Sequence, residues 1–353
     1  VPSQMALGAS ANSESNTATA ARIVGRELRS SGFNMIYGPI LDLDVNSGNP
    51  EIGIRSFSSD PETVARLGRV YMDAVAAEGV GTCPKHFPGR GRGMADAHFA
   101  LETIPASEEQ LKESDLFPFV KNSHTPALMV GHTVYSALDP DYPASLSHRI
   151  VTEILRKQIG FEGVILTDEL TMWAIAHHYT VPDACVMALQ AGADMFFLKA
   201  PEYFPATKDR ICDAVKEGRL DERHIDQSVR RVLRLKESLH IKTEFNGPPS
   251  SKATTSVWSS QHAAAAQELA EKTLVVTRGD CGGPHSRDKR VLAVIPRDIT
   301  VIQTNDGITT HEALPRALKE HFNSVEHIVI DQEIIDLQVF EVELTARRTD
   351  IGV

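Results

Sequence analysis

The chain lacks the features that would suit a nucleic-acid ligand, a membrane or a disulfide framework. Its 353 residues carry 36 Lys and Arg against 47 Asp and Glu, a formal net charge of -11. No basic stripe offsets this balance, which disfavours nucleic acid as a partner. Because no long apolar run occurs, we expect no membrane span. The cysteines, Cys83, Cys185, Cys212 and Cys281, follow neither pairing nor metal-ligand spacing, so we expect reduced, mostly packed thiols.

The remaining composition is that of a globular protein with more than one domain. Apolar residues make up 42% of the chain and charged residues 24%, and low-complexity tracts are absent. A chain of this length exceeds one average domain, which favours a large α/β domain with a smaller one. No leader is visible at Val1, yet the opening Val-Pro-Ser-Gln-Met is typical of a domain interior. The compartment, cytoplasmic or secreted, therefore stays open.

Five short apolar runs alternate with helical patterns and predict parallel strands at 34–41, 79–86, 126–132, 162–168 and 194–199. The helical pattern at 61–78 follows Asp60 as a cap, with Pro61 in its first turn. Polar residues stand at four strand ends: Asp42, Lys85 with His86, His132, and Asp168. Functional groups of a (β/α)₈ barrel collect at the carboxyl ends of its strands. The sequence therefore predicts an α/β fold of this TIM-barrel type.

A stretch rich in Pro, Gly, Ser and Thr separates two parts of the chain. We predict a barrel domain over 1–242, a linker over 243–260 and a smaller α/β domain over 261–353. The second domain should contain a helix at 261–272 and strands at 273–277, 291–295 and 327–331. The closing Asp-Ile-Gly-Val is the start of a further strand, so we expect this domain to be cut short.

Residues 85–98, Lys-His-Phe-Pro-Gly-Arg-Gly-Arg-Gly-Met-Ala-Asp-Ala-His, carry the strongest functional pattern. Residues two apart in an extended loop project to the same side, so Asp96 can accept a hydrogen bond from one nitrogen of His98. That bond would fix the imidazole tautomer and raise the basicity of the other nitrogen. Asp168 ends an apolar strand, where a parallel sheet presents a carboxylate at its edge. Asp168 could instead cap a following helix, and Asp96 could make only a local turn bond.

These motifs resemble glycoside hydrolase family 3 and, within it, the β-N-acetylhexosaminidase branch. The likeness extends over Gly-Pro-Ile-Leu-Asp at 38–42, Asn-Pro-Glu-Ile-Gly-Ile-Arg-Ser-Phe at 49–57 and the helix at 230–236. Asp96 follows Lys85 by eleven residues, which is the spacing of this branch. The resemblance implies retaining hydrolysis of terminal β-linked N-acetylglucosamine through a covalent glycosyl-enzyme, on small carbohydrates such as peptidoglycan fragments. It implies no cofactor and no metal.

The resemblance also assigns roles to individual residues. Asp168 would be the nucleophile, with His98 as the acid/base oriented by Asp96. The substrate would be bound by Arg55, Lys85, His86 and His132, although surface or packing roles stay open for Arg55 and His132. We expect Asp42 to orient basic neighbours.

The sequence departs from the family pattern in several places. The family usually has Ser where Ala97 stands and His where Arg90 stands. It also begins with three further strands that supply a sugar-binding Asp and Arg. We therefore expect an N-terminally incomplete barrel, inefficient by itself. Because some relatives use phosphate as the acceptor, and Arg90 and Arg92 could attract it, a phosphorylase is an alternative.

Three further alternatives stay open. Asp96, His98 and His132 could hold a metal, although no paired ligand spacing supports this. The Gly-rich run at 89–93 could cradle a phosphate, although no helix start follows it. The chain could also be a non-catalytic carbohydrate-binding remnant.

Overall fold

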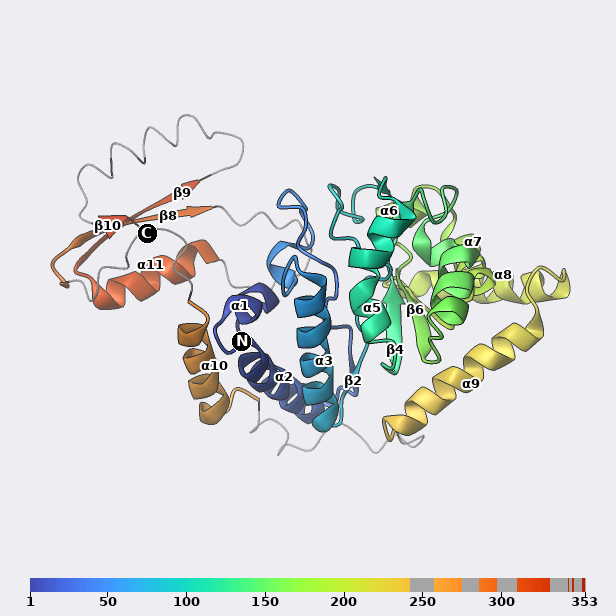
Figure 1. The fold of residues 1–353 in the computed structure, drawn as a ribbon, viewed down its shortest axis with the longest axis horizontal. Helices are drawn as coiled ribbons and strands as arrows, with labels where there is room; N and C mark the ends of the chain where they lie inside the picture. Colours follow the sequence, from blue (N-terminus) through green and yellow to red (C-terminus); the bar gives the residue numbers. More distant parts are fainter. Residues whose placement is uncertain are drawn as a thin grey trace. The chain divides into compact units, whose positions relative to one another are not determined.

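The structure is a computed structural model. It describes residues 1–241, 257–274, 286–296, 310–330, 342, 345 and 351–352. The chain divides into two compact units, Val1–Val275 and Val276–Val353, which we describe separately (Figure 1).

Five short parallel strands form the centre of the first unit, in chain order. They are β1 Met35–Ile36, β2 Gly81–Thr82, β4 Ala127–Val130, β6 Val164–Glu169 and β7 Met195–Phe197. β1 pairs with β2, and β6 lies between β4 and β7. A bridge between Phe87 and Val130 joins the continuation of β2 to β4. Among the described strands, no pairing joins β7 back to β1.

Each of the five predicted strands contains an observed one, which confirms the α/β class. The observed strands are shorter than the apolar runs. After Ile36 the first run continues only as a bridge between Ile40 and Lys85. Pro39 and Pro84 lie in these two segments and have no N–H to donate to a ladder. β4 is fully buried, as expected for a strand covered on both faces.

Helices cover the strands of the first unit. Neighbouring helices pack in the pairs α2–α3, α3–α5 and α7–α8 (Figure 1). The α-helices are α1 Gln4–Ala9, α2 Ser13–Ser30, α3 Pro61–Ala77, α4 Glu108–Gln110, α5 Phe117–Lys121, α6 Trp173–Ala176, α7 Val181–Ala191, α8 Phe204–Lys216, α9 Glu222–Ser238 and α10 Ser260–Lys272. The 3-10 helices are η1 Gly53–Arg55, η3 Ala144–Leu146 and η5 Pro201–Tyr203. The π-helices are η2 Leu111–Asp115 and η4 Arg149–Gln158. None of the described helices is long and apolar enough to cross a membrane.

The helix predicted at 61–78 is α3, and its first turn forms as the sequence indicates. The Asp60 side chain accepts a hydrogen bond from the Thr63 N–H, and Pro61 occupies a position where no intrahelical donor is needed. α3 buries Val64, Leu67 and Val75, three of its apolar residues. The apolar period of this helix thus fixes which face meets the core.

Helix α10 belongs to the first unit, whereas the sequence predicts that residues 261–272 belong to the second domain. Leu269 packs with Leu7 and Ile23, and the His262 Nδ1 lies 2.9 Å from a carboxylate oxygen of Glu27. Residues 242–256, most of the expected linker, lie outside the described residues. Cys83 and Cys185 are free and buried, Cys212 is free and exposed, and Cys281 is outside the described residues.

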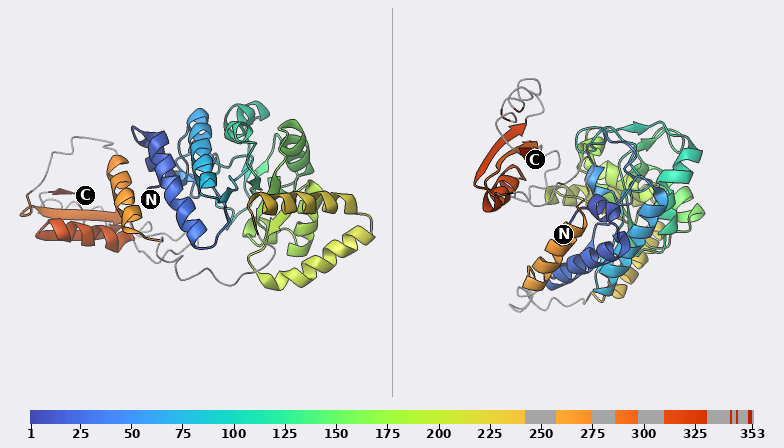
Figure 2. Two further views of the ribbon diagram at one scale, coloured as in Figure 1. Left: turned by 90° about the horizontal axis from the view of Figure 1, so that it is seen from below. Right: turned by 60° about the vertical axis from the view of Figure 1, so that its left-hand side comes forward.

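Among its described residues, the second unit contains three parallel strands and a helix. β8 Arg290–Pro296 pairs with both β9 Ser324–Ile330 and β10 Ile351–Gly352. Helix α11 Thr310–His321 connects β8 to β9 and packs against both (Figure 2). This βαβ unit confirms the strands predicted near 291–295 and 327–331. Thr273 instead closes α10, and 275–277 lie outside the described residues.

Candidate active site

Asp168 lies near the carboxyl end of β6, and its side chain is 16% exposed. One oxygen accepts the Glu169 N–H at 2.8 Å. Burial alone would raise the pKa of Asp168, but the positive field of His86, His132 and Lys85 outweighs it and lowers the pKa to about 2. Asp168 is therefore an ionised carboxylate at neutral pH, with one side open to solvent.

His86 is fixed between two carboxylates. Its Nδ1 lies 2.8 Å from Asp42 Oδ2, and its Nε2 lies 3.8 Å from Asp168 Oδ2. Asp42 is fully buried, and the same Oδ2 accepts the His86 backbone N–H at 3.0 Å. Burial opposes ionisation of Asp42, but His86 and the hydrogen bond from Arg90 lower its pKa. Asp42 thus orients a basic neighbour, as expected, although it lies beyond the end of β1 and after the Ile40–Lys85 bridge.

Lys85 lies close enough to Asp168 and to Arg55 for their charges to shift its pKa. Burial lowers the pKa of the Lys85 ammonium, and Asp168 opposes this shift while Arg55 adds to it. Arg55 donates to the Glu51 carbonyl at 2.7 Å from the end of η1. Lys85, one of the residues predicted to bind substrate, therefore lies near Asp168, and Arg55, another of them, lies near Lys85.

His132 has both ring nitrogens engaged within the protein. Nδ1 lies 2.8 Å from the Ser145 hydroxyl, and Nε2 lies 3.0 Å from the Glu169 carbonyl. Burial lowers the pKa of His132, in spite of Asp168 nearby. A sugar contact by His132 would require one of these bonds to break.

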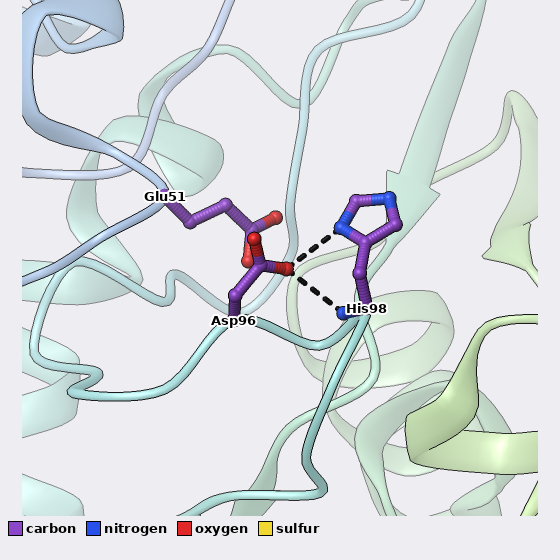
Figure 3. Close-up of side chains that lie close together, drawn as sticks. All are labelled: Glu51, Asp96 and His98. Carbon is purple, nitrogen blue, oxygen red and sulfur yellow. Dashed lines mark hydrogen bonds and ion pairs between the residues drawn. The ribbon is translucent and has the colours of Figure 1, made fainter. Parts of the chain in front are cut away.

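Asp96 and His98 form the expected pair on the loop after β2 (Figure 3). Asp96 Oδ1 lies 2.7 Å from His98 Nδ1 and also accepts the His98 backbone N–H at 2.8 Å. Asp96 is buried, whereas the His98 side chain is 38% exposed. The Nδ1–H tautomer that this bond favours leaves Nε2 free to exchange a proton with a ligand.

The dyad loop is attached to the segment that follows Asp168. The Ala174 N–H donates to the Ala97 carbonyl at 3.1 Å. Ala97 is buried in one apolar cluster with Met172 and Ala174. These contacts bring the residue beside His98 against the residues that follow the candidate nucleophile.

Side chains from other segments hold the backbone of the Gly-rich run at 89–93. The Arg90 N–H donates to Asp42 Oδ1 at 2.8 Å, and the Asn49 amide donates to the Arg90 carbonyl at 2.9 Å. The Tyr135 hydroxyl donates to the Gly89 carbonyl at 2.8 Å. A Cβ on Gly91 would collide with the Leu43 backbone, so this approach requires glycine. Carbonyl groups that accept bonds within the protein do not form a phosphate cradle.

The two arginines expected to attract phosphate are engaged in ion pairs. Arg90 contacts Glu51 with NH1 at 2.9 Å and NH2 at 2.6 Å, and both side chains are 3% exposed. Arg92 contacts Asp115 at 2.8 Å. The expectation that Arg90 and Arg92 attract phosphate is wrong because both guanidinium charges are paired with carboxylates.

One group of potential metal ligands occurs among the described residues. Glu51, Asp96 and His98 offer ligand atoms within 4.8 Å of one another (Figure 3). Both Glu51 oxygens already contact Arg90, and the Asp96–His98 bond occupies a further ligand atom on each. His132, the third ligand in the sequence-based set, is not in this group. The arrangement fits a hydrogen-bonded network better than a cation site.

An α/β domain that gathers carboxylates and imidazoles at the carboxyl ends of parallel strands is a common enzyme architecture. The sequence model of the glycosyl hydrolase family 3 N-terminal domain matches residues 1–235. The chain therefore belongs to glycoside hydrolase family 3.

Individual relatives are similar over different shares of their length. The chain is 31% identical over 240 residues to beta-hexosaminidase A of Pseudoalteromonas piscicida, covering 62% of this chain and 40% of that protein. It is 31% identical over 298 residues to a beta-N-acetylglucosaminidase/beta-glucosidase of Cellulomonas fimi, covering 80% and 51%. The chain thus spans about half the length of these relatives or less. The solved β-N-acetylglucosaminidase of Paenibacillus sp. FPU-7 superposes with a TM-score of 0.88 at 32% identity, covering 100% of this chain and 67% of that one.

Sequence reasoning missed Glu51. Glu51 lies in the Asn-Pro-Glu-Ile-Gly segment. The one feature that could have indicated its role is Arg90, because a buried guanidinium needs a carboxylate partner. No local sequence pattern predicts the contact between Glu51 and Arg90, because the two residues are 39 positions apart.

Proposed function

We propose that the protein removes terminal β-linked N-acetylglucosamine from small carbohydrates with retention of configuration. The observation that carries this proposal is the part-buried Asp96–His98 bond on a loop that contacts the segment following Asp168. Membership of glycoside hydrolase family 3 and similarity to proteins named beta-hexosaminidase support the substrate class. Peptidoglycan fragments are the substrates we would test first.

The first half of the reaction breaks the glycosidic bond. An Asp168 oxygen attacks the anomeric carbon and forms an ester, while the bonding electrons leave with the glycosidic oxygen. Doubly protonated His98 donates its Nε2 proton to that oxygen, and Asp96 keeps the Nδ1 proton in place. The low pKa of Asp168 supports its role, because an ionised carboxylate is required for attack.

The second half releases the sugar. Nε2 of the now neutral His98 takes a proton from water, and the water oxygen attacks the anomeric carbon. The bond to Asp168 breaks, which returns its carboxylate and the protonated imidazole. Two inversions at one carbon give net retention.

The remaining candidates would hold the sugar. Lys85 provides a cationic donor near Asp168, Arg55 provides a second one near Lys85, and the Nε2 of His86 faces the Asp168 carboxylate. His132 would act mainly by supporting the Glu169 carbonyl directly after Asp168. Because Arg90 and Arg92 are already paired, we expect water and not phosphate to be the acceptor.

Covalent labelling tests the assignment directly. A fluorinated N-acetylglucosamine with an activated leaving group should inactivate the protein and add one sugar to the peptide that contains Asp168. Proton NMR of the first product formed from an aryl β-N-acetylglucosaminide should show the β anomer. A sugar attached to Glu169 or Asp96, or an α product, would contradict the mechanism. A rate that rises with added phosphate would favour the phosphorylase instead.

A further inference from the structure

We propose that Glu51, held by Arg90, is a positioning residue for the Asp96–His98 dyad. This inference rests on the proposed function, because it concerns the same proton transfer. It assigns a role to the two residues whose pairing the sequence did not predict.

The Glu51–Arg90 ion pair is buried and makes two contacts. The two terminal guanidinium nitrogens of Arg90, Nη1 and Nη2, contact Glu51 at 2.9 and 2.6 Å, and both side chains are 3% exposed. A two-point contact of this kind fixes direction as well as distance. Burying two charges is costly, so such a pair is weak evidence for stability and better evidence for a fixed geometry.

Glu51 also contacts the loop that carries Asp96 and His98. Its Oε2 accepts the backbone N–H of Ala97, the residue between Asp96 and His98, at 3.3 Å. In Figure 3 the Asp96 carboxylate lies between Glu51 and the His98 ring. Asp96 Oδ2 is buried and has no hydrogen-bond partner among the described residues. Only Oδ1 of Asp96 is therefore engaged, and it is engaged with His98.

Charge balance explains why Glu51 must be an acid. Arg90 is a permanent buried cation, and without Glu51 the carboxylate of Asp96 would be an alternative partner for it. Glu51 neutralises Arg90 and leaves the negative charge of Asp96 to the imidazole. Glu51 also repels Asp96 as a like charge, which disfavours movement of Asp96 away from His98.

The same arginine connects the dyad to the nucleophile side of the site. The Arg90 N–H donates to Asp42 Oδ1, and Asp42 Oδ2 holds His86, whose Nε2 lies 3.8 Å from Asp168. A set of polar contacts thus runs from Asp168 to the loop of His98, and each contact is a hydrogen bond except the 3.8 Å approach of His86 to Asp168. Glu51 and Arg90 set the distance between the proposed nucleophile and the proposed acid/base.

Glu51→Gln is the direct test, because it keeps the shape of the side chain and removes its charge. We expect kcat/KM for an alkyl N-acetylglucosaminide, a poor leaving group, to fall about 100-fold, as misplacement of a catalytic group by an ångström can cause. An activated aryl glycoside, which needs little proton donation, should lose less than about threefold. Equal losses on both substrates would overturn the proposal.

Asp194→Asn is the matched control. Asp194 is a fully buried carboxylate paired with Arg156 and Arg231, and it contacts no residue of the dyad. Its loss should lower the melting temperature without a leaving-group effect. Arg90→Lys provides a second route if Glu51→Gln is poorly folded, because it keeps the charge and loses the two-point contact. It should show the same preference for the activated substrate, and an equal loss on both substrates would overturn the proposal.

A spectroscopic measurement separates this inference from the proposed function. In protein with ¹⁵N-labelled histidine, His98 is identified by the signals missing from His98→Asn. The wild-type imidazole should be mainly the Nδ1–H tautomer, and Glu51→Gln should shift it toward Nε2–H while Asp194→Asn leaves it unchanged. An unchanged tautomer in Glu51→Gln overturns the inference whether or not the protein hydrolyses glycosides. A shifted tautomer in a protein without glycosidase activity would refute the proposed function alone.

A double-mutant cycle completes the test. If Glu51 acts through His98, then Glu51→Gln should change kcat/KM by less than about twofold when His98 is already Asn. Fully additive losses would show that Glu51 acts elsewhere.

Discussion

The two ends of the same parallel strands carry buried charges in different arrangements. Near the start of β6, Asp194 contacts Arg156 at 2.7 Å and Arg231 at 2.8 Å, and it accepts the Ile165 N–H at 2.9 Å. Near its carboxyl end, Asp168 has histidines and a lysine around it, and no arginine of the described residues lies within salt-bridge range of it. One carboxylate is enclosed by permanent cations, and the other is balanced by groups that can exchange protons.

This difference separates a structural charge from a reactive one. Asp194 has no exposed side-chain surface, whereas Asp168 keeps 16% and His98 keeps 38%. Arginine keeps its proton, so a carboxylate between two arginines cannot take part in acid/base chemistry. Imidazoles can gain and lose protons near neutral pH. Asp194 near the start of β6 is therefore held by fixed cations, whereas Asp168 near its carboxyl end is surrounded by groups that titrate. The fixed Glu51–Arg90 pair on that side contacts the dyad loop and not Asp168.

The largest effect should come from the nucleophile. Asp168→Ala should lower kcat by about 10⁴-fold or more on every N-acetylglucosaminide, because the covalent step is lost. Steady-state assays with aryl and alkyl substrates measure this loss. Activity that survives within tenfold of wild type would remove the contrast between Asp168 and Asp194.

The next effect should depend on the substrate. His98→Asn should lower turnover of poor leaving groups by about 10²–10⁴-fold and leave activated aryl glycosides much less affected. The slope of log(kcat/KM) against leaving-group pKa measures this difference and should become steeper. An unchanged slope would make His98 a structural residue, comparable to Arg156 at the other end.

Asp194→Asn should affect stability and not chemistry. Removing one partner from a buried ion pair leaves a desolvated cation, which should cost about 3 kcal/mol of unfolding free energy. Urea unfolding measures the loss, and kcat at a temperature where the variant stays folded should match wild type within about twofold. A fall in kcat with unchanged stability would reverse the comparison between the two ends.

The smallest effect is a pH-dependent share of stability from Asp168. Its pKa of about 2 lies below the unfolded value of about 3.9, so the folded state favours the carboxylate. This stabilisation, about 2.5 kcal/mol, is complete above about pH 5 and is lost as the pH falls toward 2. The difference in unfolding free energy between wild type and Asp168→Asn should therefore shrink by about half at pH 3. A difference that is constant with pH would show that Asp168 keeps an ordinary pKa.

Local patterns predicted much of the first unit. Each of the five runs predicted as strands between 34 and 199 overlaps an observed strand, because a strand buried on both faces needs a continuous apolar segment, whereas the strand predicted from Thr273 is wrong at its start, where Thr273 closes α10. The Asp96–His98 contact could also be predicted, because two residues on one loop meet through geometry that the chain carries with it. The place of Asp168 near the end of β6 follows from the same local reasoning.

Only the tertiary structure decided how these parts work together. Glu51 meets Arg90, and Asp42 meets His86, across intervals of 39 and 44 residues that no local pattern spans. The same holds for α10, whose Leu269 packs with Ile23 of α2, more than 200 positions away along the chain. A sequence determines its periodicities and short-range pairs by itself, because these depend on neighbours along the chain. The partner of a buried charge depends on which distant segment the fold brings within hydrogen-bond distance.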